Sequence, residues 1–486
     1  MKRSAARPPL GADVWRVCVV VILGMVMSTL DTTIVNVALI SLSRDLKTSL
    51  DTVQWVVTGY LLALAAVIPT TGWAAKRYGT KRLFLISIVV FTFGSALCGL
   101  SPSIAWLIAF RVLQGVGGGM IVPLGMMLVV KKAGPQRLAR VMSAISVPVI
   151  LGPVVGPTIG GLLLDHAGWR WIFYVNLPVG VAAFVAALRL LPADQPEDAG
   201  PLDISGLAIV APGLVGITYG LAKIGVDPFL SATVLAPLLA GAALVTVFVI
   251  RALRVDRPLL DMRLYKDKSF SAASLTTFCL GAAMFGGLIL MPLYFQTVRG
   301  EDALRTGLLL GPQGIGSALA VWWAGGLVDR YGAGLVSICG ALVSIATTVP
   351  FLFLGAHTAY LPVEFAMLAR GLGVGLSSMP AMTAALRGLT PDQVNDATPQ
   401  INVVQRVGSS IGTAILTVIL QNHLDHAGTA AGQAHAFGVS FGWVLAITAV
   451  ASLPTVLLWW IERRARLDGA PPLAGEVTSD ALVGAA

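Results

Sequence analysis

Residues 83–126 read LFLISIVVFTFGSALCGL-SPS-IAWLIAFRVLQGVGGGMIVPLGM, two apolar runs joined by Ser101-Pro102-Ser103. A helix needs about 20 apolar residues to cross the hydrocarbon core of a bilayer. Each run is long enough to cross once, and the short connection leaves no room for a domain outside the membrane. The pattern predicts a tight hairpin of two transmembrane helices.

The rest of the chain repeats this pattern. The 486 residues are 56% hydrophobic and 12% charged, whereas a soluble domain carries about 25% charged residues. The sequence therefore predicts an all-α polytopic membrane protein with fourteen transmembrane helices, and its first run is expected to be a helix and not a signal peptide. The predicted spans are 14–40, 52–74, 82–101, 103–126, 139–165, 170–192, 203–223, 229–251, 268–296, 304–328, 332–354, 358–384, 400–424 and 436–462.

The basic residues predict the orientation. With fourteen crossings both termini share a side, and placing that side in the cytoplasm puts about 24 of the 33 Lys and Arg inside, as the positive-inside rule expects. The net charge of +9 is then explained by topology, so nucleic acid is not an expected partner. We expect a multi-pass protein of the inner or plasma membrane with both termini cytoplasmic.

Two marks recur at a similar spacing. Residues 72–79 read GWAAKRYG and residues 325–332 read GGLVDRYG, which places Arg77 and Arg330 253 residues apart; Arg111 and Arg370, each followed by glycines, are 259 apart. Transporters are often built from such repeats. The predicted architecture is two six-helix bundles with two inserted helices. Its parts are a first bundle (1–195), the inserted helices (196–262), a second bundle (263–465) and a flexible cytoplasmic tail (466–486).

Five further motifs carry a family resemblance: LDTTIVNVAL at 30–39, RVLQGVG at 111–117, GPVVGPTIGG at 152–161, WRWIFYVNLPVG at 169–180, and PLYFQ at 292–296 followed by VRG at 298–300. With the two loops, they resemble the fourteen-helix drug:proton antiporter family of the major facilitator superfamily, which includes multidrug and quaternary-ammonium-compound exporters. The resemblance implies the major facilitator fold and antiport driven by a proton gradient, without a cofactor. The first loop motif departs from the family at Lys76, where the family has Asp. In the second loop motif the corresponding residue is Asp329, as in the family.

Asp31 is the predicted proton-coupling residue. It is the only acid deep in a span of the first half, and an ionisable group there is costly and therefore a functional candidate. Burial favours its protonated form. The alternative is a structural Asp that hydrogen-bonds Thr29, Thr32 or Asn36.

Arg111 is the second predicted coupling residue. It keeps its charge, so it would steer the protonation of a nearby carboxylate or bind substrate, and Gln114 lies on the same helix face. The alternative is an anchor to backbone carbonyls. Arg370 and Arg406 are similar cations in the second half. Glu364 is either a second proton site or an interfacial carboxylate.

The fifth predicted helix has a gating motif. Gly152, Gly156 and Gly160 share one face, which permits close approach of a neighbouring helix, and Pro153 and Pro157 permit a bend. The full motif comprises Gly152, Pro153, Gly156, Pro157, Gly160 and Gly161. The cytoplasmic loop motifs comprise Gly72, Arg77, Gly79, Asp329, Arg330 and Gly332. Simple close packing is the alternative for the helix motif.

The predicted substrate cavity rests on polar and aromatic side chains within spans, since polyspecific sites combine flexible apolar walls with a few polar groups. For any single one of them, packing against lipid or core is the alternative. The candidates are Gln54, Trp55, Tyr60, Gln114, Met284, Tyr294, Gln296, Gln313, Gln400, Asn402, Gln405 and Arg406.

The sequence thus predicts a proton-driven exporter of small amphipathic or cationic compounds, functional as a monomer. A phosphate-binding Gly-rich loop and a catalytic constellation are not visible, so an enzyme is not expected. His423 and His426 are too few for a metal site, and the four cysteines are expected to be buried, isolated thiols. An exporter of a lipid or of an endogenous metabolite or antibiotic is the first alternative; a non-transporting membrane sensor or lipid enzyme is the second.

Overall fold

The computed structural model describes residues 11–134, 137–193, 196–224, 227–228, 230–386 and 389–467. The predicted tail lies, from residue 468 onward, outside these ranges. The first part of the chain folds into a group of mostly long helices. They are α1 (Ala12–Val37), α2 (Leu39–Asp45), α3 (Leu50–Val67), η1 (Ile68–Thr70), α4 (Thr71–Tyr78), α5 (Thr80–Leu100), α6 (Ile104–Ala133), α7 (Leu138–Ala167), α8 (Trp171–Tyr174) and α9 (Asn176–Leu190).

Two long helices and a short turn follow, and a second group completes the chain. The connecting elements are α10 (Ile204–Lys223), α11 (Ala232–Ala252) and η2 (Met262–Lys266). The second group comprises α12 (Lys268–Leu293), η3 (Tyr294–Val298, a π-helical turn), α13 (Ala303–Tyr331), α14 (Ala333–Thr348), η4 (Val349–Phe353), α15 (Tyr360–Leu386), α16 (Pro391–Leu424) and α17 (Ala430–Leu467).

The predicted fold class is confirmed. Within the described ranges, 11 helices are long and apolar enough to cross a membrane. Three further predicted runs coincide with α7, α13 and α15, which are 30, 29 and 27 residues long. The total of fourteen crossings stays a prediction.

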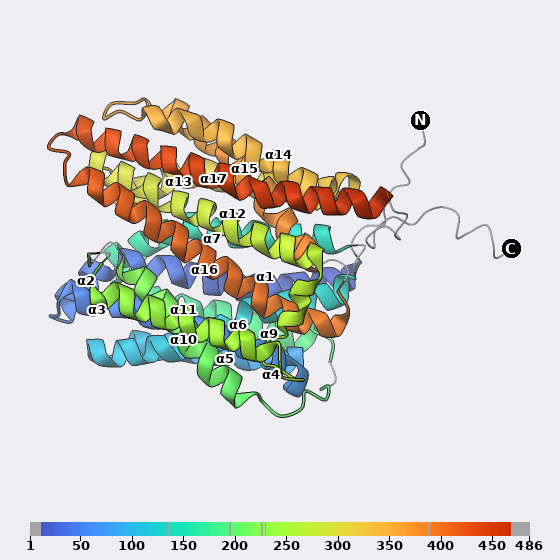
Figure 1. Ribbon diagram of the computed structural model, residues 1–486. Helices are drawn as coiled ribbons and strands as arrows, with labels where there is room; N and C mark the ends of the chain where they lie inside the picture. The colour runs from blue at the N-terminus through green and yellow to red at the C-terminus, as the bar shows by residue number, and fades with distance from the viewer. Residues whose placement is uncertain are drawn as a thin grey trace.

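The helices form two groups that meet along a long interface (Figure 1). α7 of the first group packs along α13 of the second, and α16 packs against α4 and α6. The inserted α10 and α11 pack on each other; α10 also contacts α3 and α16. α1 begins and α17 ends at the same end of the bundle (Figure 1). We call it the basic end, because it carries Lys76, Lys131, Arg140 and Arg330.

Among the residues that the structure describes, the apolar core is continuous between the groups only toward the basic end. One cluster of buried side chains there unites residues of both groups, from Val14 and Met127 to Phe270, Val328 and Val394. Toward the opposite end the clusters are separate, and each draws on one group alone. Burial of apolar surface therefore holds the groups together at the basic end.

The start of α16 corrects the sequence prediction. The apolar run placed it at residue 400, but the helix begins at Pro391 because Thr390 and Gln393 form a capping box. Polar residues of this added segment pack between the groups and so do not appear as an apolar run. α17 is likewise longer than the predicted 436–462 span, since it runs from residue 430 to residue 467.

Candidate functional site

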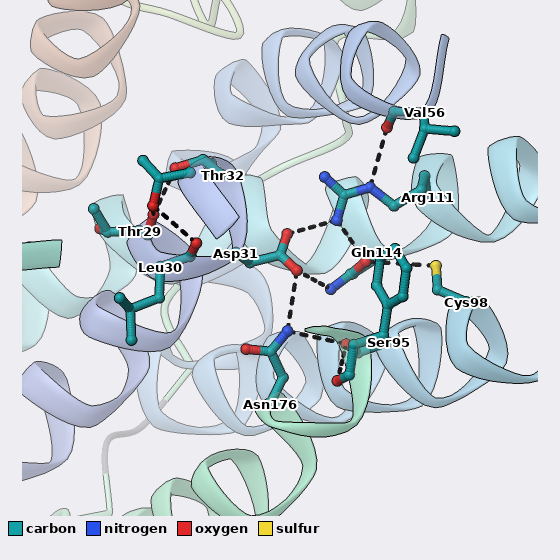
Figure 2. A network of polar contacts seen from close by, with 12 residues as sticks. Thr29, Leu30, Asp31, Thr32, Val56, Ser95, Cys98, Arg111, Gln114 and Asn176 are labelled. Atoms are coloured by element: carbon teal, nitrogen blue, oxygen red, sulfur yellow. Dashed lines mark hydrogen bonds and ion pairs between the residues drawn. The ribbon is translucent and has the colours of Figure 1, made fainter. Parts of the chain in front are cut away.

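Asp31 lies at the centre of a buried polar network (Figure 2). Its side chain is fully buried on α1. Oδ2 accepts a hydrogen bond from Arg111 Nη1 at 2.6 Å, and Oδ1 accepts from Gln114 Nε2 at 2.9 Å and from Asn176 Nδ2 at 3.0 Å. One cation and two amide groups therefore stabilise the ionised carboxylate.

In addition to the Asp31 carboxylate, Arg111 has partners that carry no charge. Its Nε donates to the Val56 carbonyl at 3.1 Å, and its Nη1 donates to Gln114 Oε1 at 2.8 Å. The guanidinium also lies over the Tyr60 ring, 4.1 Å from the centroid, where the ring face attracts a cation.

Three helices complete the network. Asn176, at the start of α9, also donates to Ser95 Oγ at 3.1 Å, and Ser95 donates to the Phe173 carbonyl at 2.9 Å. The Cys98 thiol lies 3.6 Å from Gln114 Oε1. Asn176, Ser95 and Cys98 were not predicted as site residues; a polar Asn inside an apolar run was the one signal that pointed to this group.

The structural alternative for Asp31 named the wrong partners. Thr29, Thr32 and Asn36 each donate to a backbone carbonyl of their own helix, at 2.8, 2.6 and 3.4 Å. Asp31 instead bonds side chains from α6 and α9. The carboxylate therefore links separate helices.

The predicted gating motif lies against the Asp31 helix. On α7, a β-carbon at Gly152 would lie 2.9 Å from Thr29 Cγ2, and one at Gly160 would lie 2.9 Å from Ile34 Cγ1. A β-carbon at Gly156 would collide with the Thr33 hydroxyl. The three glycines thus let α7 approach the turns of α1 that flank Asp31.

The other residues of that motif have different surroundings. A β-carbon at Gly161 would meet nothing within 4 Å. The helix continues through Pro153 and Pro157 from residue 138 to residue 167; the side chains of both prolines lie outside the described residues. A bend at these positions stays a prediction.

The two predicted loop motifs, at residues 72–79 and 325–332, make equivalent close approaches to the opposite group. A β-carbon at Gly72 would lie 2.5 Å from the Asn395 carbonyl oxygen on α16. A β-carbon at Gly325 would lie 3.0 Å from Arg140 Cα on α7. Gly79 and Gly332 end these segments at φ of +84° and +92°, a conformation that favours glycine.

Each loop motif also forms an ion pair across the interface. Lys76 Nζ lies 2.8 Å from Asp396 Oδ2, and Asp329 Oδ2 lies 3.7 Å from Arg140 Nε. In both pairs the cation belongs to the first group and the anion to the second. The family has Asp at the position of Lys76. Because this chain has a cation there, the first loop motif also pairs a cation of the first group with an anion of the second. Arg77 and Arg330 are exposed.

The cavity candidates do not gather at one place in the structure. Trp55 stacks on Tyr219 of the inserted α10, and Tyr294 donates to the Gly355 carbonyl, toward the end opposite the basic end. Gln400 and Asn402 lie near the basic end, where Gln400 donates to the Asp261 carbonyl and Asn402 Nδ2 lies 3.5 Å from Met126 Sδ. The remaining placements are Tyr60 and Gln114 at the Asp31 network, Met284 and Gln313 inside the second group, half-buried Gln405 and Arg406 on α16, and exposed Gln54 and Gln296.

The cysteines differ in how far they are buried. All four cysteines are free, but Cys339 is exposed and Cys279 is only partly buried. This corrects the prediction of four buried thiols, because both lie on helix faces that the neighbouring helices leave uncovered. Across the described ranges no group of three or more His, Cys, Asp or Glu could hold a metal ion.

Comparisons with known proteins identify the family. The model of the Major Facilitator Superfamily matches residues 21–413. The chain is 41% identical over 421 residues to the "Multidrug resistance protein B homolog" of Mycobacterium tuberculosis strain H37Rv, which covers 86% of this chain and 78% of the relative. It is 31% identical over 404 residues to the "Uncharacterized MFS-type transporter YhcA" of Bacillus subtilis strain 168, over 83% of this chain and 76% of the relative.

Solved structures agree with the fold. The proton:xylose symporter XylE superposes with a TM-score of 0.63 at 16% identity, over 90% of this chain and 94% of that one. At this identity the likeness concerns the fold alone. The family match agrees with the buried Asp31 network and the paired loop motifs. The chain therefore belongs to the major facilitator superfamily and is a multi-pass membrane transporter of small molecules.

Proposed function

We propose that this transporter exports small amphipathic or cationic compounds in exchange for protons, by alternating access. Its 41% identity to a protein named for multidrug resistance supports a drug-efflux role. The further details of the proposal are fourteen crossings in the inner or plasma membrane, cytoplasmic termini, a monomer as the working unit, and quaternary ammonium compounds among the substrates.

The observation that carries the proposal is the buried ion pair of Asp31 and Arg111. Asp31 is fully buried and Arg111 is 1% exposed, so neither a proton nor a substrate reaches the carboxylate in this conformation. Exchange at Asp31 therefore needs a rearrangement of the helices around it. A transporter that must change conformation to load and release its proton is an alternating-access machine.

The surroundings of Arg111 suit reversible protonation. When Asp31 binds a proton, the guanidinium loses its countercharge but keeps the Val56 carbonyl, Gln114 Oε1 and the Tyr60 ring. A buried cation left without any partner would cost several kcal/mol. Because these neutral partners remain, the proposed cycle does not leave the guanidinium without a partner when a proton or a cationic substrate occupies Asp31.

The basic end supports the direction of the cycle. The shared apolar core and the pairs of Lys76 with Asp396 and Arg140 with Asp329 close this end. If it faces the cytoplasm, as the basic residues predict, the conformation is one that is closed inward. Export then requires these pairs to open so that substrate can enter.

The test is transport by Asp31→Asn in proteoliposomes with an imposed pH gradient. Ethidium serves as the cationic probe, and the control is Asp13→Asn, since Asp13 is an exposed acid on the same helix. We expect Asp31→Asn to bind ethidium but to lose pH-driven accumulation, while Asp13→Asn keeps it and Asp31→Glu keeps part of it with a shifted pH profile. Concentrative, pH-driven uptake by Asp31→Asn at equal protein density would disprove the coupling role.

A further inference from the structure

The repeat places a second buried arginine where the first group has its coupling pair. Arg370 on α15 follows Arg111 by 259 residues, and its side chain is 2% exposed. Arg111 forms an ion pair with Asp31 and donates hydrogen bonds to groups on α1, α3 and its own α6. Arg370 has none of these: over the ranges that the structure describes, it forms no ion pair, and its Nη1 has no hydrogen-bond partner.

The partners are missing because the residues at the matching positions differ. Gly287 on α12 follows Asp31 by 256 residues, within the spacing of the repeat. It lies directly beside the guanidinium, since a β-carbon at Gly287 would meet Arg370 Nη2. Gly373 stands three residues after Arg370, as Gln114 stands three after Arg111. The carboxylate and the amide of the first site are both replaced by glycine.

The remaining neighbours of the guanidinium do not supply a negative charge. Val444 of α17 is apolar, and its Cγ1 would lie 3.3 Å from a β-carbon at Gly287. Glu364 is on the same helix as Arg370 but six residues earlier, which is about 240° around the helix and about 9 Å along it. It therefore lies on a different face and does not pair with Arg370.

A guanidinium stays charged under all physiological conditions. Burying it without a counter-charge is strongly unfavourable, and Arg370 carries N–H donors in a planar fork that suits an anion. Gly287 brings the α12 backbone directly beside the fork, since a β-carbon there would collide with Nη2, whereas a β-carbon at Gly373 would meet Ser344 of α14. These features together describe a site that is complete only with an external negative group.

We propose that Arg370, flanked by Gly287 and Gly373, binds a monovalent anion in the second group of helices, either chloride or the carboxylate of an organic compound. The proposal does not rest on proton coupling at Asp31, because it concerns binding to a separate cation. It adds an acidic or zwitterionic class to the compounds that the transporter would accept, should the carboxylate be the natural occupant.

The test measures thermal unfolding of the purified full-length protein as an anion replaces MES, a bulky sulfonate that carries no carboxylate, at constant ionic strength. Chloride is the probe for a free ion, and benzoate, compared with neutral benzamide, is the probe for an organic carboxylate. We expect Tm to rise and saturate with chloride or with benzoate, because a ligand that binds only the folded state stabilises it in proportion to occupancy. A response to benzoate alone would assign the site to an organic acid.

Two variants and a control place the effect at Arg370. Arg370→Gln should abolish the saturable rise, whereas Arg189→Gln, at an exposed cation on α9, should leave it intact. Gly287→Asp supplies an internal carboxylate, so it should raise Tm in MES and remove the response to added anions. If Arg370→Gln does not fold, Gly287→Asp alone decides. An absent response in the wild type, or a response that survives in either Arg370→Gln or Gly287→Asp, overturns the proposal.

Discussion

Reversing the charge of Lys76 should open the basic end. The Lys76–Asp396 pair has an N–O distance of 2.8 Å, with side chains 22% and 24% exposed. Exposed pairs contribute up to about 1 kcal/mol, and breaking a fully buried pair costs about 3–5 kcal/mol. For this partly buried pair, Lys76→Asp should shift the equilibrium between open and closed forms by about 2 kcal/mol, which is about a 30-fold change in their ratio.

The assay is a distance measurement across the basic end. Spin labels at Arg77→Cys on α4 and Gln393→Cys on α16, both exposed positions, report separation of the two groups in a Cys339→Ala background. Lys76→Asp should populate a longer distance, because two carboxylates then face each other. The double variant Lys76→Asp/Asp396→Lys restores the pair and should restore the short distance.

The control is Arg82→Asp, which makes the same change of charge at an exposed position in the first turn of α5. It should leave the distance distribution as in the wild type. The reasoning fails if Lys76→Asp leaves the short distance unchanged, or if Arg82→Asp lengthens it equally. It also fails if the double variant stays open, since the pair itself would then not hold the end closed.

Three further predictions concern packing and capping. Gly156→Val should abolish transport and lower Tm, because α7 could no longer lie against α1, whereas Gly161→Ala should be neutral in both assays. Glu462→Ala should lower the stability by about 1–3 kcal/mol, measured by thermal unfolding, since a backbone N–H in the first turn of α14 loses its buried acceptor. Burial opposes the ionisation of Asp203, but hydrogen bonds from Arg251 and two backbone N–H groups lower its pKa overall. Its contribution to stability is therefore complete above the ordinary pKa of Asp, about 3.9, and is lost as the pH falls further; Asp203→Asn should remove this acid dependence of Tm.

The helices and the candidate residues Asp31 and Arg111 were predictable from the sequence because polar and charged groups are costly in lipid. In lipid, apolar runs must be helical, and an ionisable residue inside such a run is costly. Asp31 and Arg111 were therefore conspicuous before any contact was known. That their side chains meet was not predictable, because the two residues are 80 positions apart and the chain between them folds through four helices whose rotations depend on packing.

The partners at the basic end were less predictable. Asp396 lies 320 residues from Lys76, in a segment that the hydropathy pattern left outside any helix. The capping box at Thr390 and Gln393 was a readable signal for an earlier helix start, and it would have placed Asp396 near the loop motif. The cavity candidates failed to converge because polarity in a span does not tell which neighbour the side chain faces: Trp55 faces α10, and Gln400 faces the loop that follows α11.

The arrangement of helices suggests how protonation could reach the basic end. Arg111 bonds the Val56 carbonyl of α3, and α3 continues through η1 into α4, which carries Lys76. On the other side of Asp31, the glycines of α7 contact α1, and the first turn of α7 carries Arg140. Both cations that close the basic end thus belong to helical segments that touch the Asp31 network. Loss of the Asp31–Arg111 pair would release contacts on both segments together, and because packed helices shift between discrete arrangements, one proton could bias both ion pairs at once.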